Sequence, residues 1–156
     1  MADDIESLRR ILQACRTVAI VGLSDQWHRP SNFVAKYLQH LGWRVVPVNP
    51  RCDSILGEKC YARLEDIPFA VDMVDVFRKP EDLPPIARSA VAMGAKCLWQ
   101  QLGVANAQAD AMAREAGLAS VMDRCVKIEY ARLFGGLHWV GVNTRVVSAR
   151  RALRPG

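Results

Sequence analysis

The chain of 156 residues is long enough for one domain with a sizeable core, and its 51% hydrophobic and 24% charged residues are ordinary globular values. No run approaches the roughly 18 apolar residues that a membrane span requires. The start MADDIESLRR is acidic and polar, which excludes a secretory signal. We therefore expect a cytoplasmic protein without a membrane partner.

The net charge of +5 is concentrated at the end of the chain. Residues 1–133 carry 17 basic and 16 acidic groups, whereas residues 134–156 carry four arginines and no acid. Because the body is nearly neutral, nucleic acid is disfavoured as a partner. We expect residues 1–133 to form one binding domain and residues 134–156 to form a basic tail or arm.

The five cysteines are odd in number and widely spaced: Cys15, Cys52, Cys60, Cys97 and Cys125. No C-x-x-C pair and no Cys/His cluster at zinc spacing occurs, so we expect reduced thiols and no metal site. Cys125 leaves an alternative open. The neighbouring cation Arg124 favours the reactive thiolate form, and a mixed disulfide with a thiol ligand is conceivable there.

Helical and apolar stretches alternate along the chain. Periodicity predicts helices over residues 4–15, 31–41, 81–93, 106–116 and 126–133. Short apolar runs predict strands over 18–21, 43–48, 58–61, 71–77, 95–99 and 118–122, the third being a brief edge strand. Residues 54–57 are expected to form a turn or half-helix. This alternation is typical of an open parallel α/β sheet.

The stretch TVAIVGLSDQWHRPS, residues 17–31, joins the first strand to a helix through Gly22. Glycine permits a sharp turn, and the start of a helix directs free backbone N–H groups at an anion. The fingerprint G-x-G-x-x-G is absent, but the loop carries the hydroxyls of Ser24 and Ser31 and the guanidinium group of Arg29. We interpret it as a phosphate-binding loop built partly from side chains. An ordinary strand-to-helix loop with a serine N-cap is the alternative.

The second predicted strand ends in Asn49-Pro50-Arg51, where NAD-binding folds usually hold an acid that accepts from the ribose. A neutral residue and a cation there favour a ligand with a phosphate on its ribose, such as NADP or coenzyme A. A solvated surface arginine is the alternative. Ligands of open parallel sheets bind outside the carboxyl ends of the strands, so the polar residues at the other strand ends are also candidates.

Six stretches, taken in order, resemble the small CoA-binding domain proteins: VAIVGLS, VVPVNPR, ILGEKCY, VDVFRKP, LWQQLG and MDRCVKIE. These proteins are relatives of the N-terminal domain of the succinyl-CoA synthetase alpha subunit. The resemblance runs from about Thr17 to Leu133. We predict an open parallel sheet with strand order 3-2-1-4-5-6, a rudimentary third strand and helices on both faces, and the resemblance implies a Rossmann-like fold. It also implies coenzyme A or an acyl-CoA along the strand ends.

The resemblance also assigns residues by position. Gly22, Leu23, Ser24 and Arg29 would face the pyrophosphate, with Ser31 in the same loop. Asn49, Pro50 and Arg51 would approach the adenosine and its 3′-phosphate, and Phe77, Arg78, Trp99, Gln100 and Gln101 would line the pocket beyond.

The synthetase keeps its phosphorylated histidine in a second domain, and His28, His40 and His138 lie outside the matching stretches. No arrangement of serine or cysteine with a base indicates a nucleophile. We therefore expect a non-catalytic binding, sensing or accessory protein, with an NADP-binding or acyl-CoA-processing enzyme as the alternative. A monomer or weak homo-oligomer is expected, with its partner surface at the aromatic residues Trp43, Phe134 and Trp139.

Overall fold

The computed structural model describes residues 5–134. The chain divides after Arg124 into two compact units, and each is described by itself. The second unit contributes helix α5 (Val126–Phe134). Within the described range, no helix is long and apolar enough to cross a membrane.

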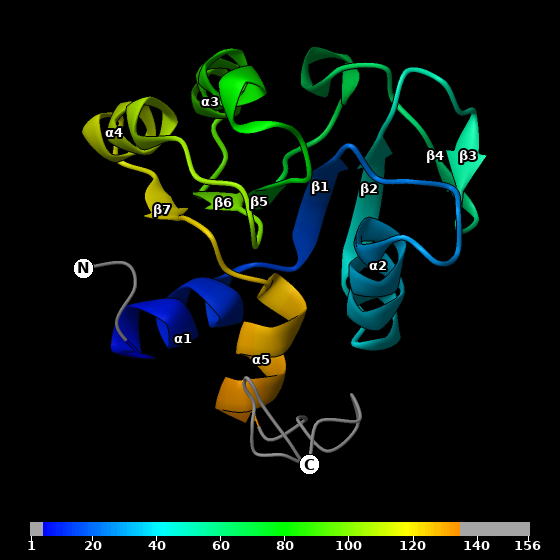
Figure 1. Ribbon diagram of the computed structural model, residues 1–156, viewed down its shortest axis with the longest axis horizontal. Helices are drawn as coiled ribbons and strands as arrows, with labels where there is room; N and C mark the ends of the chain where they lie inside the picture. Colours follow the sequence, from blue (N-terminus) through cyan, green and yellow to red (C-terminus); the bar gives the residue numbers. More distant parts are fainter. Residues whose placement is uncertain (1–4, 135–156) are drawn as a thin grey trace. The chain divides into compact units, whose positions relative to one another are not determined.

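The first unit alternates strands with helices, as the sequence predicts (Figure 1). Its helices are α1 (Ile5–Ala14), α2 (Pro30–His40), α3 (Leu83–Ala92) and α4 (Ala107–Glu115), with 3₁₀ turns η1 (Leu64–Asp66) and η2 (Pro80–Asp82). Its strands are β1 (Thr17–Val21), β2 (Arg44–Val48), β3 (Ser54–Ile55), β4 (Glu58–Lys59), β5 (Met73–Val76), β6 (Cys97–Gln100) and β7 (Ala119–Val121).

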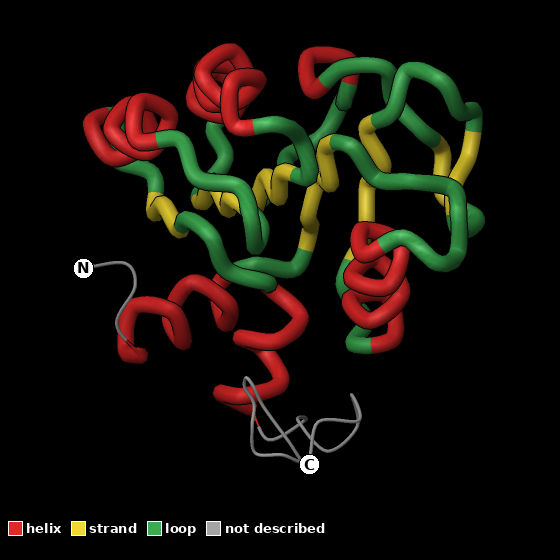
Figure 2. The backbone as a smooth tube through the Cα atoms, viewed as in Figure 1, coloured by secondary structure: helices red, strands yellow, loops and turns green. Residues whose placement is uncertain are grey.

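Five strands form one parallel sheet in the order β2-β1-β5-β6-β7, drawn in yellow in Figure 2. The predicted order of the main strands is therefore confirmed. The rudimentary third strand is a single parallel bridge between Tyr61 and Val48, with the Tyr61 N–H donating to the Pro47 carbonyl at 3.0 Å. The turn predicted over residues 54–57 is confirmed at Leu56 and Gly57, whereas Ser54 and Ile55 instead form β3 of the antiparallel β3–β4 hairpin.

Helices cover both faces of the sheet, with α3 and α4 on one side and α1 and α2 on the other (Figure 1). Successive strand residues point to opposite faces. One face packs against α3 and α4 in a cluster that includes Ala19, Val21, Val46, Val48, Val74, Val76 and Leu98. The strands are buried on both faces, and this explains why they appear in the sequence as continuous apolar runs.

The first turn of α2 buries the polar Ser31 and Asn32, and Phe33 beside them is 45% exposed. One expectation about an aromatic residue is corrected. Trp43 was a candidate for a partner surface, yet it is only 4% exposed and belongs to the core. Trp139 lies outside the described residues.

Gly22 lies where β1 leaves the sheet and passes close to the end of β5. Its φ is +86°, and a Cβ at this position would lie 2.5 Å from the carbonyl oxygen of Phe77. The backbone is fixed on both sides, because the Gly22 N–H donates to Val48 and the Phe77 N–H donates to Val21. Glycine is therefore required here by backbone packing as well as by φ.

We predict that Gly22→Ala destabilises the fold more than Gly94→Ala does. Gly94 has a similar φ of +77°, but a Cβ added there would have no other atom within 4 Å, so its substitution should cost only the left-handed conformation, about 1–2 kcal/mol. Gly22→Ala adds a clash with backbone atoms that cannot rotate away. Urea unfolding of both variants measures the difference, and equal losses would contradict the packing argument.

Candidate functional site

The carboxyl ends of β1, β2 and β5 meet where the chain order of the sheet reverses. β1 and β5 are neighbours in the sheet, and the connection after β1 leads to β2 whereas the connection after β5 leads to β6, so the two leave in opposite directions. Open parallel sheets bind their ligands in the crevice outside such a switch point. The residues just beyond these strand ends therefore define the candidate site.

The β1–α2 loop is organised by its own hydrogen bonds. The Ser24 N–H donates to Ser31 Oγ at 2.9 Å, the Gln26 N–H donates to Ser24 Oγ at 3.1 Å, and Asn32 Nδ2 donates to the Ser24 carbonyl at 2.9 Å. Ser31 is buried inside the first turn of α2, and the N-cap position belongs to Arg29, which makes no side-chain cap. Ser31 therefore shapes the loop, while the Ser24 hydroxyl keeps its proton for a further acceptor.

Asn49 ties the end of β2 to this loop. Its Nδ2 donates to the Leu23 carbonyl at 2.9 Å, and its Oδ1 accepts from the Arg51 N–H at 2.8 Å. A carboxylate could accept from the Arg51 N–H but could not donate to the Leu23 carbonyl, so the fold favours asparagine over an acid here whatever the ligand. The missing acid at this position is thus explained by structure, and the argument for a ribose phosphate depends on Arg51 alone.

We predict that Asn49→Asp destabilises the protein by about 1–3 kcal/mol at neutral pH, because a carboxylate would face the Leu23 carbonyl and lose the donated bond. The exposed Gln108→Glu variant carries the same change of charge on α4 and serves as control. Chemical denaturation at pH 7 gives both values. An Asn49→Asp variant as stable as its control would show that the amide contact is dispensable.

Two arginines at this edge are exposed: Arg29 before α2 and Arg51 after β2. Among residues 5–134, no hydrogen bond or ion pair engages either guanidinium group. Pro50, between Asn49 and Arg51, is also exposed. Arg78, just beyond β5, differs because it forms an ion pair with Asp82 at 3.3 Å. Phe77 beside it is half-buried.

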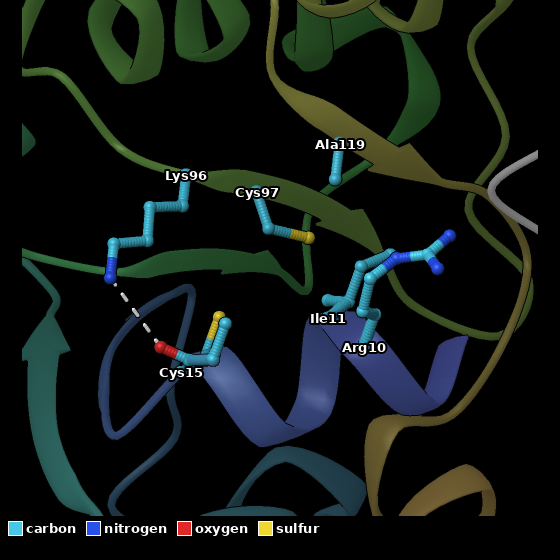
Figure 3. A pocket seen from close by; sticks show the side chains of 7 residues that line it. Arg10, Ile11, Cys15, Lys96, Cys97 and Ala119 are labelled. Carbon is cyan, nitrogen blue, oxygen red and sulfur yellow. Dashed lines mark hydrogen bonds between the residues drawn. The ribbon is translucent and has the colours of Figure 1, made fainter. Parts of the chain in front are cut away.

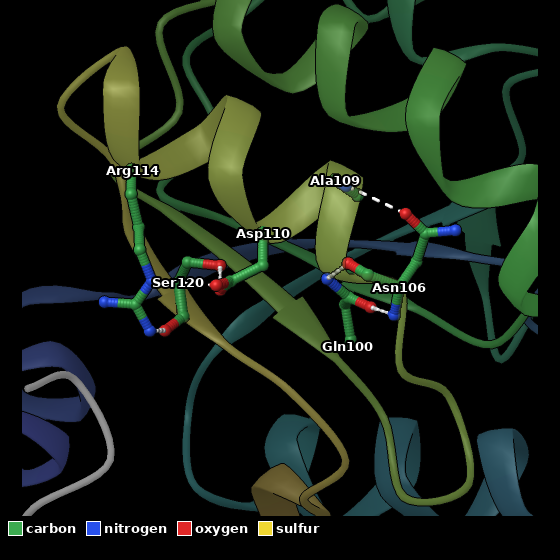
Figure 4. A network of polar contacts seen from close by, with 6 residues as sticks. All are labelled: Gln100, Asn106, Ala109, Asp110, Arg114 and Ser120. Atoms are coloured by element: carbon green, nitrogen blue, oxygen red, sulfur yellow. Dashed lines mark hydrogen bonds and ion pairs between the residues drawn. The ribbon is translucent and has the colours of Figure 1, made fainter.

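The residues at the end of β6 are buried and hold the following loop in place. Gln100 contacts Asn106 through both ends of its amide: Oε1 accepts from the Asn106 N–H at 2.7 Å and Nε2 donates to its carbonyl at 3.2 Å (Figure 4). Asn106 in turn caps α4 by accepting from the Ala109 N–H at 2.8 Å, as the sequence predicts. Trp99 donates from Nε1 to the Arg124 carbonyl at 2.7 Å. Contact of these side chains with a ligand remains a prediction.

Asp123 is a residue of this edge that the sequence analysis did not select. It adopts a left-handed φ of 58°, its Oδ1 accepts from the Gly103 N–H at 2.6 Å, and its own N–H donates to Val104 at 3.1 Å. These bonds hold the β6–α4 loop, which begins with the buried Gln101. A lone aspartate after a strand gives no sequence signal of such a clamp.

An open pocket of about 290 Å³ lies beside the ends of β1 and β2, on the α3 face of the sheet. Val21 and Val48 contribute from the strands, and the other lining residues are Ala62, Arg63, Leu64, Glu65, Pro85, Ile86 and Ser89. Its apolar walls include Ile86 and Pro85, and the Ser89 hydroxyl donates to Glu65 at the rim. Residues 64–68 lie outside the predicted helices and strands, and the sequence did not predict this pocket.

A second cavity of about 230 Å³ lies at the opposite, amino edge, between α1 and the starts of β6 and β7 (Figure 3). Cys15 and Cys97 line it as free thiols. Burial raises the pKa of Cys15 to about 12, with the Asp72 carboxylate acting in the same direction, and burial also raises the pKa of Cys97. Both thiols are therefore protonated at neutral pH. No group of three or more potential metal ligands occurs among the residues with described positions.

Asp75 and Asn32 are buried polar residues with unsatisfied oxygens. Asp75 is 0% exposed, and neither of its carboxyl oxygens has a hydrogen-bond partner; the same holds for Oδ1 of Asn32. Burial raises the pKa of the Asp75 carboxyl group well above its ordinary value, which favours the neutral form. The sequence signal for this buried acid is a single aspartate inside the apolar run VDVF.

We predict that Asp75→Asn gains stability relative to wild type as the pH rises. A raised folded-state pKa means that the carboxyl group's contribution is fully present below its unfolded value, near about 4, and is lost as pH rises through the folded pKa. The asparagine does not titrate. Urea unfolding at pH 5 and pH 8 measures the change, with the exposed Asp53→Asn as control. A pH-independent difference between Asp75→Asn and wild type would contradict the buried neutral acid.

The parallel sheet, its strand order and its flanking helices define a Rossmann-like α/β domain. Within that class, the chain belongs to the family of CoA binding domains, whose model matches residues 16–131. The resemblance stated from the sequence is thus confirmed.

The chain is also similar to individual known proteins. The chain is 39% identical over 124 residues to the uncharacterized protein YneT of Bacillus subtilis (strain 168), covering 80% of this chain and 92% of that protein. It is 31% identical over 83 residues to acetate–CoA ligase (ADP-forming) II of Archaeoglobus fulgidus, a match of 52% of this chain but 12% of the ligase. A solved structure, a hypothetical protein from Pyrococcus horikoshii OT3, has a TM-score of 0.82 at 40% identity, covering 85% of this chain and 93% of that one.

Proposed function

We propose that the protein binds coenzyme A or an acyl-CoA at the carboxyl ends of its parallel strands. The observation that carries the proposal is the exposed guanidinium group of Arg51, which follows β2 and has no partner in the described part of the chain. Arg51 lies one strand away from the β1–α2 loop, with which Asn49 connects it. A cation in this place suits a phosphate at the adenosine end of a ligand.

The remaining groups fit the other parts of coenzyme A. The Ser24 hydroxyl and Arg29 would bind the pyrophosphate at the start of α2, where the helix dipole also favours negative charge. The pocket beside Val21 and Val48 would receive the adenine ring between apolar walls. The pantetheine arm of coenzyme A would then run past Phe77 toward the end of β6.

We propose a binding, sensing or accessory role rather than catalysis. At this edge, Asn49 and Gln100 hold loops together and Arg29 and Arg51 present cations without a partner in the described part of the chain. Neither arrangement supplies a nucleophile with an adjacent base. An acyl-CoA-processing enzyme remains the alternative, and a relative named as an acetate–CoA ligase is the observation that favours it.

NADP is the other ligand compatible with Arg51. Thermal unfolding with coenzyme A, acetyl-CoA, NADP and NAD, measured side by side, distinguishes them. A ligand at 100 times its Kd stabilises the protein by about 2.7 kcal/mol, which is readily seen. We expect stabilisation by coenzyme A or acetyl-CoA, and stabilisation by NADP alone would overturn the proposal.

We predict that Arg51→Ala weakens coenzyme A by about tenfold or more and leaves dephospho-CoA nearly unchanged, because only the former carries the 3′-phosphate. Ser24→Ala should weaken both ligands alike, since both keep the pyrophosphate. Calorimetric titration gives all four affinities. Arg88→Ala, which removes an exposed arginine from α3, is the matched control and should change neither ligand.

The result that contradicts this assignment is an equal loss for both ligands in Arg51→Ala. The 3′-phosphate would then belong to Arg29 or Arg78, and the same pair of ligands applied to those variants would identify which.

A further inference from the structure

The pocket at the ends of β1 and β2 combines an apolar lining with two polar side chains that meet at its rim. Pro85 and Ile86 line it from α3, and buried valines line it from the two strands. Glu65 of η1 and Ser89 of α3 also line it, and the Ser89 hydroxyl donates to Oε2 of Glu65. Arg63, the other charged residue of the lining, forms an ion pair with its neighbour in η1 at 3.3 Å. Small-molecule pockets typically have this composition, in which a few polar groups fix the orientation of an apolar ligand.

The Glu65 carboxylate is held in place and remains open to a ligand. Pro85 and Ile86 lie four and three residues before Ser89, so one face of α3 supplies both the apolar wall and the hydroxyl. The hydrogen bond from Ser89, followed by one from the Glu65 backbone N–H, lowers the pKa of the Glu65 carboxyl group, which is therefore ionised at neutral pH. Glu65 is exposed, and an ionised carboxylate has about four positions at which it accepts hydrogen bonds. It can therefore accept from a ligand as well as from Ser89.

We propose that Glu65, positioned by Ser89, accepts a hydrogen bond from the exocyclic amino group of the adenine ring of coenzyme A and so selects this base. The inference rests on the proposed function. Ser24 and Arg51 follow the two strands whose ends line the pocket, so phosphates bound by these residues would direct the base between them into it. An amino group donates and a carboxylate only accepts, so the two groups match. An oxygen at the same position of another purine would bring two acceptors together and form no such bond.

The test compares adenosine 3′,5′-bisphosphate with purine riboside 3′,5′-bisphosphate, which lacks only the amino group. Wild-type protein should bind the adenosine compound about three- to tenfold more tightly. Glu65→Ala should bind both compounds alike, because the acceptor is gone, whereas Glu65→Gln keeps an acceptor oxygen and should retain part of the preference. Glu115→Ala, which removes an exposed carboxylate from the end of α4, is the matched control and should keep the full preference. Calorimetric titration measures each pair.

A further variant tests the role of Ser89 as a positioning residue. Ser89→Ala leaves the carboxylate in the pocket without the hydroxyl that orients it, and should reduce the preference for the amino group without abolishing it. Equal binding of the two compounds by wild-type protein, or an undiminished preference in Glu65→Ala, would overturn the role of Glu65 while the proposed function stands. Failure of wild-type protein to bind coenzyme A would instead overturn the proposed function.

Discussion

The close approach of β1 to the end of β5 is the constraint on which the rest of the site depends. Gly22 turns the chain out of the sheet at a point where a Cβ would lie 2.5 Å from the Phe77 carbonyl oxygen. This turn delivers the β1–α2 loop to the carboxyl edge and places the Leu23 carbonyl where Asn49 can bind it. The ends of β1, β2 and β5 are thereby fixed relative to one another independently of any ligand contact.

Amide side chains organise most of this edge. Asn32 holds the first loop, Asn49 connects it to the second, and Gln100 with Asn106 fixes the loop after β6. Asn49 and Gln100 each donate and accept, so they satisfy backbone N–H and carbonyl groups that no strand or helix pairs. None of these contacts uses the guanidinium groups of Arg29 and Arg51, which stay available for an anion.

Although strand order leaves no local pattern, the sequence predicts the strands and the α-helices, because buried parallel strands and amphipathic helices leave local patterns of hydrophobicity. It also locates the candidate site, since strand ends in such a sheet converge on one edge. The sequence does not predict the roles of individual polar residues. Asn49 was interpreted as a sign of the ligand, whereas its amide is needed by Leu23, a partner 26 residues away that only the fold brings near.

Ser31, Gln100 and the β3–β4 hairpin illustrate the same limit. Ser31 and Gln100 are polar residues beside a predicted ligand edge, and their hydrogen-bond partners lie seven and six residues away in the adjoining loops, which have no periodic pattern in the sequence. The hairpin has strands of two residues, too short for any periodic signal. The walls of the pocket come from η1 and α3, whose juxtaposition no local pattern encodes.

The most direct test of the central claim is a map of amide chemical-shift changes on titration with coenzyme A. The account predicts that the changes cluster at residues 22–29, at 49–51 and at 77–78, along the carboxyl edge of the sheet. Changes centred on the opposite cavity, around Cys15, Lys96 and Cys97, would contradict it, as would a spectrum that coenzyme A leaves unchanged.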